Sequence, residues 1–149
     1  MAMDVALALN KEARELDGLG IAVFQFDELV FSRYPDKIKE WGITALDRCL
    51  ESVERAQTAA HICYRYPMPA VPSPIVDGYP VILNASEHLK ISQLEFEFET
   101  SRFDHKPLGL CPSNVMFGYN DNSIYAIETP EHVADQLLAA AKCIPAEPI

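Results

Sequence analysis

Residues 89–100 read Leu-Lys-Ile-Ser-Gln-Leu-Glu-Phe-Glu-Phe-Glu-Thr, and this stretch decides the predicted fold. Its second half alternates strictly between apolar and acidic side chains. A period of two is typical of a β-strand that buries one face and leaves the other in water. The residues predicted to point inward are Leu94, Phe96 and Phe98, and those predicted to point outward are Glu95, Glu97 and Glu99. The pattern predicts a sheet with helices against its apolar face.

The apolar positions change phase inside the same stretch. Leu89 and Ile91 are odd-numbered, whereas the later apolar residues are even-numbered. One inserted residue reverses which face every later side chain of a strand occupies. We therefore predict a β-bulge or a change of strand near Ser92 and Gln93.

Three helices are predicted around this strand. Residues 4–17 and residues 44–61 both carry apolar side chains at helical spacing, and the second segment has a charged opposite face. The last helix begins at Thr129 and Pro130, because threonine caps a helix N-terminus and proline fits its first turn. This helix is predicted to end near Cys143.

The remaining strands complete the predicted fold. Besides residues 89–100, the predicted strands are residues 20–26, 79–83, 115–119 and 124–128. Residues 29–33 are predicted as either a further strand, in a hairpin with residues 20–26, or a loop. Residues 20–26 are apolar on both faces, which favours a place inside the sheet. The last two strands form a predicted hairpin across Asn-Asp-Asn-Ser, a run of turn formers. Grouped strands and flanking helices predict an α+β fold, in which an antiparallel sheet of about five to six strands packs against two or three helices.

Length and charge limit the class of protein. A chain of 149 residues is expected to form one domain, here residues 1–144, followed by a frayed tail at 145–149. The net charge of −10 would repel nucleic acid. No apolar run reaches the roughly 18 residues of a membrane helix, and the first residues lack a basic leader. We therefore expect a cytoplasmic protein without membrane or nucleic-acid partners.

The proline-rich segment 64–80 is a candidate contact region. It contains five prolines, which exclude a helix or a central strand. A rigid connector explains this composition most simply. Tyr64 and Tyr66 lie within it, and tyrosine is favoured at protein interfaces because its ring is apolar and its tip polar. The two tyrosines are therefore predicted as secondary partner contacts.

Two arrangements could carry chemistry. A cysteine-dependent hydrolase would use Cys111 with His105, which lie in one loop, but no helix N-terminus is placed to lower the pKa of the thiol. His61-x-Cys63 is half of a zinc site, and Cys49 is a possible further ligand together with His105 and Cys111. On a single helix over residues 44–61, Cys49 and His61 would be more than three turns apart. The sequence therefore predicts no catalytic residue, no metal site and no cofactor.

The acidic side of the central strand leads to the functional prediction. Glu95, Glu97 and Glu99 are predicted to dock a basic protein partner, since three carboxylates in a row exceed what solubility requires. The predicted function is non-enzymatic: a small acidic protein that neutralises or escorts its partner, as immunity proteins, inhibitors and chaperones do. The alternatives are an assembly subunit of a virion or secretion machine, for which a homo-oligomer is expected, and the cysteine hydrolase above.

Overall fold

Four parallel strands lie side by side in the order of the sequence. The protein was analysed as a computed structural model, which describes residues 1–64, 78–111, 113–121 and 126–144. The strands are β1 (Val23–Glu28), β2 (Gln57–Ile62), β3 (Gln93–Glu97) and β4 (Asn114–Gly118). All three pairings are parallel, and one register row joins Asp27, His61, Glu95 and Met116.

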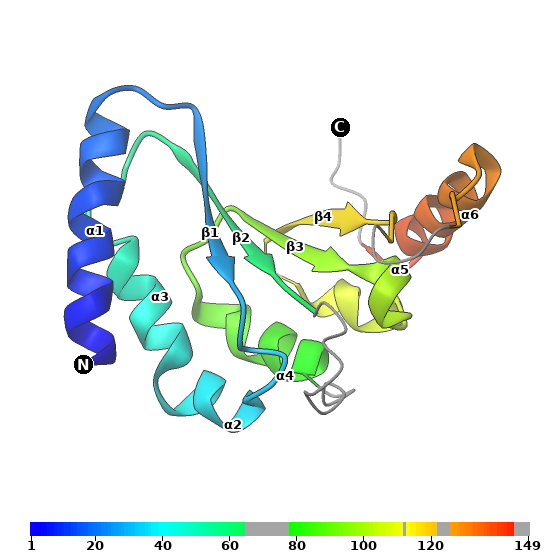
Figure 1. Cartoon of the computed structure of the whole chain (residues 1–149), viewed down its shortest axis with the longest axis horizontal. Coiled ribbons are helices and arrows are strands. Elements are labelled where there is room, and N and C mark those ends of the chain that lie inside the picture. The colour runs from blue at the N-terminus through cyan, green and yellow to red at the C-terminus, as the bar shows by residue number, and fades with distance from the viewer. Residues whose placement is uncertain (65–77, 112, 122–125, 145–149) are drawn as a thin grey trace.

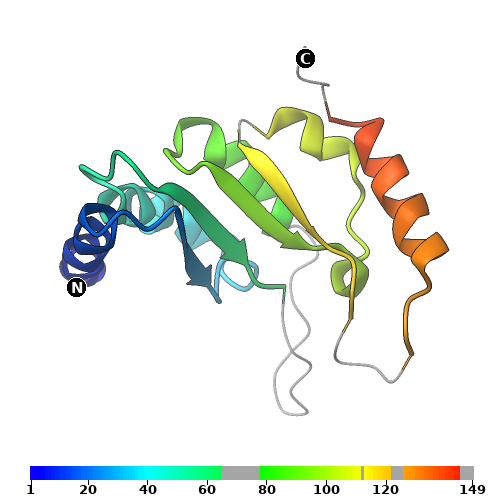
Figure 2. The same cartoon turned by 90° about the horizontal axis from the view of Figure 1, so that it is seen from above.

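Helical segments connect the strands. They are α1 (Ala2–Gly18), α2 (Pro35–Lys37), the π-helical η1 (Ile38–Gly42), α3 (Ile43–Cys49), α4 (Gly78–Ala85), the 3-10 turn η2 (Ser86–His88), α5 (Phe98–Ser101), the 3-10 segment η3 (Lys106–Leu110) and α6 (Pro130–Ala141). Figures 1 and 2 both place α1 and α3 beside β1 at one end of the molecule, and α6 at the other end beyond β4. Within the described residues, no helix is both long enough and apolar enough to cross a bilayer.

The predicted antiparallel α+β fold is wrong, because the sheet is entirely parallel and the fold is α/β. Two parallel neighbours cannot be joined by a tight hairpin, so the chain must cross back over the sheet between them. Helical segments make these crossovers between the described strands. A local alternation of apolar and polar residues specifies a strand and its buried face, and it leaves the direction of the neighbouring strand open.

The predicted helix over residues 44–61 is confirmed over residues 44–49 and wrong beyond them. α3 ends at Cys49, Ser52 adopts a left-handed backbone with φ 61°, and the chain then enters β2. Alanine-rich Thr-Ala-Ala-His has good helical propensity, but here it lies between two strands, where Ala59 and Ala60 are fully buried. Tertiary packing therefore overrides local propensity in this segment.

Two predicted strands and the predicted bulge also differ from the structure. Residues 79–83 lie in α4, and residues 126–128, the described part of the predicted strand 124–128, form no strand. Residues 29–33 form a turn, which agrees with the loop alternative and not with a hairpin strand. The phase change near Ser92 has a simpler cause than a bulge. β3 begins at Gln93, so the odd-numbered apolar residues before it belong to the preceding loop, where they are buried.

Both terminal helices are confirmed. α6 begins as predicted, with the Thr129 side chain accepting a hydrogen bond from the backbone N–H of His132. α1 covers the predicted range, and Asp17 near its end accepts hydrogen bonds from the backbone N–H groups of Ala56, Arg55 and Glu54 at 2.7, 2.9 and 3.2 Å. The Ala56 hydrogen bond is the main cause that lowers the pKa of Asp17. This carboxylate ties α1 to the chain just before β2.

The first strand lies at the edge of the sheet, and the prediction that it lies inside is wrong. Val23 and Ile21 are 48% and 40% exposed, so its apolar composition does not reflect burial within the described residues. The apolar core lies against the face of the sheet to which Ile62 of β2 and Leu94 and Phe96 of β3 point. Leu94 and Phe96 are fully buried there, as the alternation predicts, and Tyr79 from α4 packs on Phe96 with ring centroids 4.9 Å apart.

Candidate metal centre at the carboxyl edge of the sheet

The end of β2 presents a histidine and a cysteine on the same side. Ile62 is fully buried in the core, so His61 and Cys63, one residue before and after it, point to the opposite face of the sheet. Cys63 is only 7% exposed, and its backbone N–H donates to the carbonyl oxygen of Glu28 at 3.0 Å, which continues the pairing with β1. The spacing His-x-Cys therefore brings both side chains to the carboxyl edge of the sheet.

β3 adds carboxylates to the same edge. His61 Nε2 lies 3.2 Å from Glu97 Oε1, and His61 Nδ1 lies 3.2 Å from Glu95 Oε2. One ligand atom from each of His61, Cys63 and Glu97 can be chosen so that all three lie within 4.8 Å of one another. Imidazole nitrogen, thiolate sulfur and carboxylate oxygen are the donors that zinc takes in proteins. The donor set and its spacing fit a divalent metal ion of this kind.

The carboxylates also control the charge of the histidine. The hydrogen bond to Glu97, together with the negative charges of Glu95 and Glu97, raises the pKa of His61 above its usual value, against the opposing effect of burial. Metal ligation requires the neutral imidazole, so a metal ion and a proton compete for this ring.

A buried tyrosine fixes the two strands that supply these donors. The Tyr79 hydroxyl donates to the carbonyl oxygen of Ile62 at 3.0 Å and accepts from the backbone N–H of Glu97 at 3.2 Å. Burial raises the pKa of Tyr79 strongly, so its hydroxyl stays protonated and able to donate. One side chain of α4 therefore sets the spacing of β2 and β3 at the edge where the donors lie.

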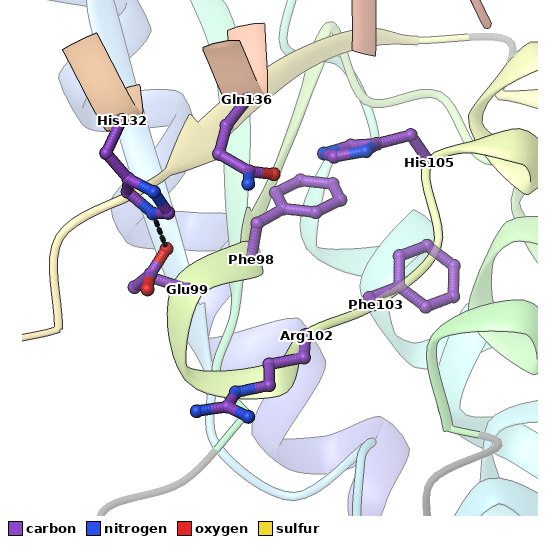
Figure 3. A pocket seen from close by; sticks show the side chains of 7 residues that line it. All are labelled: Phe98, Glu99, Arg102, Phe103, His105, His132 and Gln136. Carbon is purple, nitrogen blue, oxygen red and sulfur yellow. Dashed lines mark hydrogen bonds and ion pairs between the residues drawn. The ribbon is translucent and has the colours of Figure 1, made fainter. Parts of the chain in front are cut away.

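A cavity of about 460 Å³ lies where β3 passes into α5. Figure 3 shows His132 and Gln136 reaching from α6 toward Phe98 and Glu99 of α5. The His132 ring bonds Glu99 Oε2 at 2.8 Å, and this contact is the main cause that raises the pKa of His132. The pair joins α6 to the end of the strand that carries the candidate metal ligand.

In the alternative of a cysteine hydrolase, Cys111 would need a lowered thiol pKa and His105 as its base. Burial raises the pKa of the Cys111 thiol, which disfavours the nucleophilic thiolate. His105 Nε2 bonds the Tyr119 hydroxyl at 2.8 Å, and its ring stacks on Phe98 with centroids 5.0 Å apart. Burial lowers the pKa of His105. This histidine is thus engaged within the aromatic core near β4.

The predicted partner-binding residues occupy different surroundings. Glu95, Glu97 and Glu99 are only 23–25% exposed at their side chains, and each faces a histidine. The Tyr64 ring packs edge-on against Tyr79, with centroids 5.6 Å apart. Tyr66 lies outside the described residues. Contact of these residues with a protein partner stays a prediction, as does the basic character of that partner.

The sequence identifies His61-x-Cys63 as half of a zinc site, but it does not identify Glu97 as a further donor. The prediction of a helix over residues 44–61 concealed β2 and its pairing with β3, the strand that supplies Glu97. The donor spacing was the available signal: Ala-Ala-His-Ile-Cys places two candidate metal donors two residues apart at the end of an apolar run. That spacing puts both donors on one face of a strand.

Comparisons with known proteins find similarity to two kinds of enzyme. No family model matches the sequence. The chain is 26% identical over 142 residues to methionine synthase of Saccharolobus islandicus, which covers 92% of this chain and 38% of the relative. It is 35% identical over 63 residues to 2-hydroxypropyl-CoM lyase of Xanthobacter autotrophicus, covering 42% of this chain and 16% of that protein.

A solved structure agrees with the sequence relatives. The fold resembles that of a B12-independent methionine synthase from a Shewanella species in complex with selenomethionine, with a TM-score of 0.83 and 32% identity. The match covers 95% of this chain and 43% of that one. The chain thus spans less than half the length of the proteins that it resembles.

These findings correct the functional predictions. The relatives and the structural neighbour are enzymes, so the prediction of a non-enzymatic immunity, inhibitor or chaperone-like protein is wrong. The alternative of an assembly subunit is wrong for the same reason, and the alternative of a cysteine hydrolase is wrong because the similar enzymes are a synthase and a lyase. The comparisons indicate a fold and an enzyme class like those of methionine synthase, at low identity and over part of the relatives' length.

Proposed function

We propose that this chain supplies part of the active site of an enzyme related to the B12-independent methionine synthases, and that His61, Cys63 and Glu97 hold a divalent metal ion, with zinc the best match. One observation carries the proposal: the three donors meet within 4.8 Å at the carboxyl edge of a parallel sheet. Active sites of parallel α/β folds lie at that edge. The fold and the donors therefore point to the same place, and the relatives support an enzyme.

The position of the donor set favours a catalytic site, because active sites of parallel α/β folds lie at this edge of the sheet. A catalytic zinc site combines protein ligands with a position that takes water or substrate. His61, Cys63 and Glu97 would supply three of the protein ligands. When bound there, zinc would supply Lewis acidity that lowers the pKa of a substrate thiol. Methionine, which the relatives' name identifies as their product, contains a thioether sulfur, and this agrees with a sulfur-handling site.

The protein's own residues have separable tasks in this proposal. Cys63 and Glu97 supply negative charge, and His61 supplies a neutral donor once it has lost its proton. Tyr79 holds the two donor strands at a fixed separation. Asp27 is the β1 member of the His61 register row and is exposed, so its carboxylate is available to pair with the ammonium group of an amino-acid substrate.

Metal binding by the purified protein tests the proposal. We expect about one zinc ion per chain by elemental analysis. In the cobalt(II) form we expect a thiolate-to-cobalt charge-transfer band that disappears in Cys63→Ser. Cys143→Ser is the matched control, because this thiol hydrogen-bonds the Ala139 carbonyl at the end of α6 and takes no part in the donor cluster. Substoichiometric zinc, or a band that survives in Cys63→Ser, would refute the proposal.

A further inference from the structure

The two ring nitrogens of His61 face two different carboxylates. Glu95 is the register partner of His61 on β3, and its Oε2 lies 3.2 Å from Nδ1. Glu97 is two residues further along the strand, and its Oε1 lies 3.2 Å from Nε2. Both carboxylates are about three-quarters covered, so neither contact is a loose surface pair. The imidazole ring is thus held from both sides.

Only one of these carboxylates belongs to the donor cluster. Glu97 meets His61 and Cys63 within 4.8 Å, and Glu95 is not part of this group. Side chains two apart on a strand share a face but are separated by roughly 6.6–7 Å, so the two carboxylates serve opposite ends of the ring. Nε2 therefore lies beside Glu97, the carboxylate of the cluster, and Nδ1 lies beside Glu95.

A histidine that binds a metal through one nitrogen donates the N–H of the other, usually to a carboxylate or a carbonyl. This second hydrogen bond fixes the tautomer and the ring orientation. Among the described residues, Glu95 is the side chain with a contact to Nδ1. Asp27, across the sheet on β1, accepts a hydrogen bond from Gln25 Nε2 at 2.9 Å.

We propose that Glu95 is a positioning residue of the metal site: it accepts the Nδ1–H of His61 and so directs the Nε2 lone pair toward Cys63 and Glu97. The inference rests on the proposed function, since it concerns a ligand of the same metal. It gives Glu95 a role that differs from that of Glu97, although the two lie on the same face of one strand. Glu97 binds the metal directly, and Glu95 orients the His61 ring that binds the same metal.

Zinc affinity measured by competition with a chromophoric chelator separates these roles. Glu95→Ala is expected to weaken zinc binding by roughly 10–100-fold, as loss of such a partner does. Glu95→Gln should retain most of the affinity, because its amide oxygen still accepts the Nδ1–H. Gln93→Ala is the matched control, since Gln93 lies on the same face of β3 two register rows earlier, where it pairs with Ala59.

A second measurement requires no variant. In the zinc-loaded wild-type protein, nitrogen NMR of His61 should show a protonated Nδ1 and a metal-bound Nε2. A metal-bound Nδ1, or a Glu95→Ala variant that binds zinc as tightly as wild type, would overturn the positioning role and leave the proposed metal site intact. Wild-type protein that binds no zinc would overturn the proposed function and this inference with it.

Discussion

Removal of one hydroxyl group, in Tyr79→Phe, tests how the fold supports the candidate site. The hydroxyl donates to the Ile62 carbonyl and accepts from the Glu97 backbone N–H, so it connects the carboxyl ends of β2 and β3. The variant keeps the ring and therefore the aromatic packing on Phe96 and Phe103, with centroids at 4.9 and 5.4 Å. The substitution isolates two hydrogen bonds from the packing around them.

The expected loss of unfolding free energy in Tyr79→Phe follows from those two hydrogen bonds. A hydrogen bond contributes about 0.5–1.5 kcal/mol net, and a buried partner left unsatisfied costs more than an exposed one. Loss of both bonds of Tyr79 should lower the free energy of unfolding by about 1–3 kcal/mol. For a chain of this length, such a loss corresponds to a fall of about 2–12 °C in the midpoint of thermal unfolding. Zinc affinity should fall as well, because Cys63 and Glu97 are no longer held in register.

Urea unfolding of the metal-free protein, followed by circular dichroism, measures the change. Tyr34→Phe is the matched control, since Tyr34 is 58% exposed, and its loss of a hydroxyl should stay within about 0.5 kcal/mol. A Tyr79→Phe variant that unfolds at the wild-type urea concentration would refute the bridging role. Unchanged zinc affinity in a destabilised variant would separate the stability of the sheet from the geometry of the site.

Three further changes test other parts of the fold. Gly78→Ala should cost about 1–3 kcal/mol of unfolding free energy, because the added Cβ would lie 2.9 Å from a backbone carbon; urea unfolding measures it. The hydrogen bond to Glu99 raises the pKa of His132, so the protonated ring stabilises the fold at about pH 5.5. This stabilisation is lost as the pH rises through the folded-state pKa of His132. Thermal unfolding at about pH 5.5 and 8 should show a smaller loss in His132→Gln than in wild type, because the raised pKa of His61 contributes to the loss in both proteins. The Ala56 hydrogen bond lowers the pKa of Asp17, so the ionised carboxylate stabilises the fold above about pH 4, and this stabilisation is lost on acidification. In Asp17→Asn, the urea concentration at half-unfolding should therefore fall less steeply as the pH is lowered below about 4.

Local signals in the sequence predicted the elements that local physics determines. Thr129 and Pro130 start α6 as expected, because a capping hydroxyl and a fixed φ act within a single turn. The alternation in β3 correctly buries Leu94 and Phe96. A side chain's own neighbours in sequence contain enough information for these predictions.

Long-range choices could not be predicted in the same way. The direction of strand pairing depends on crossover connections, and the alternation in β3 is compatible with either direction. Residues 57–62 are a strand because β1 and β3 flank them, and the alanines in the segment favour a helix when it is judged alone. The metal centre depends on that same pairing, which brings Glu97 of β3 to His61 and Cys63 after β2.

X-ray absorption spectroscopy of the zinc-loaded protein tests the central claim most directly. The account predicts a first shell with one sulfur at about 2.3 Å and nitrogen or oxygen neighbours at about 2.0–2.1 Å. It also predicts the outer-shell scattering of a single imidazole ring. Loss of the sulfur in Cys63→Ser and of the imidazole signal in His61→Ala would assign both ligands. A first shell of oxygen alone, unchanged in both variants, would show that zinc binds elsewhere and would contradict the assignment of this edge as the active site.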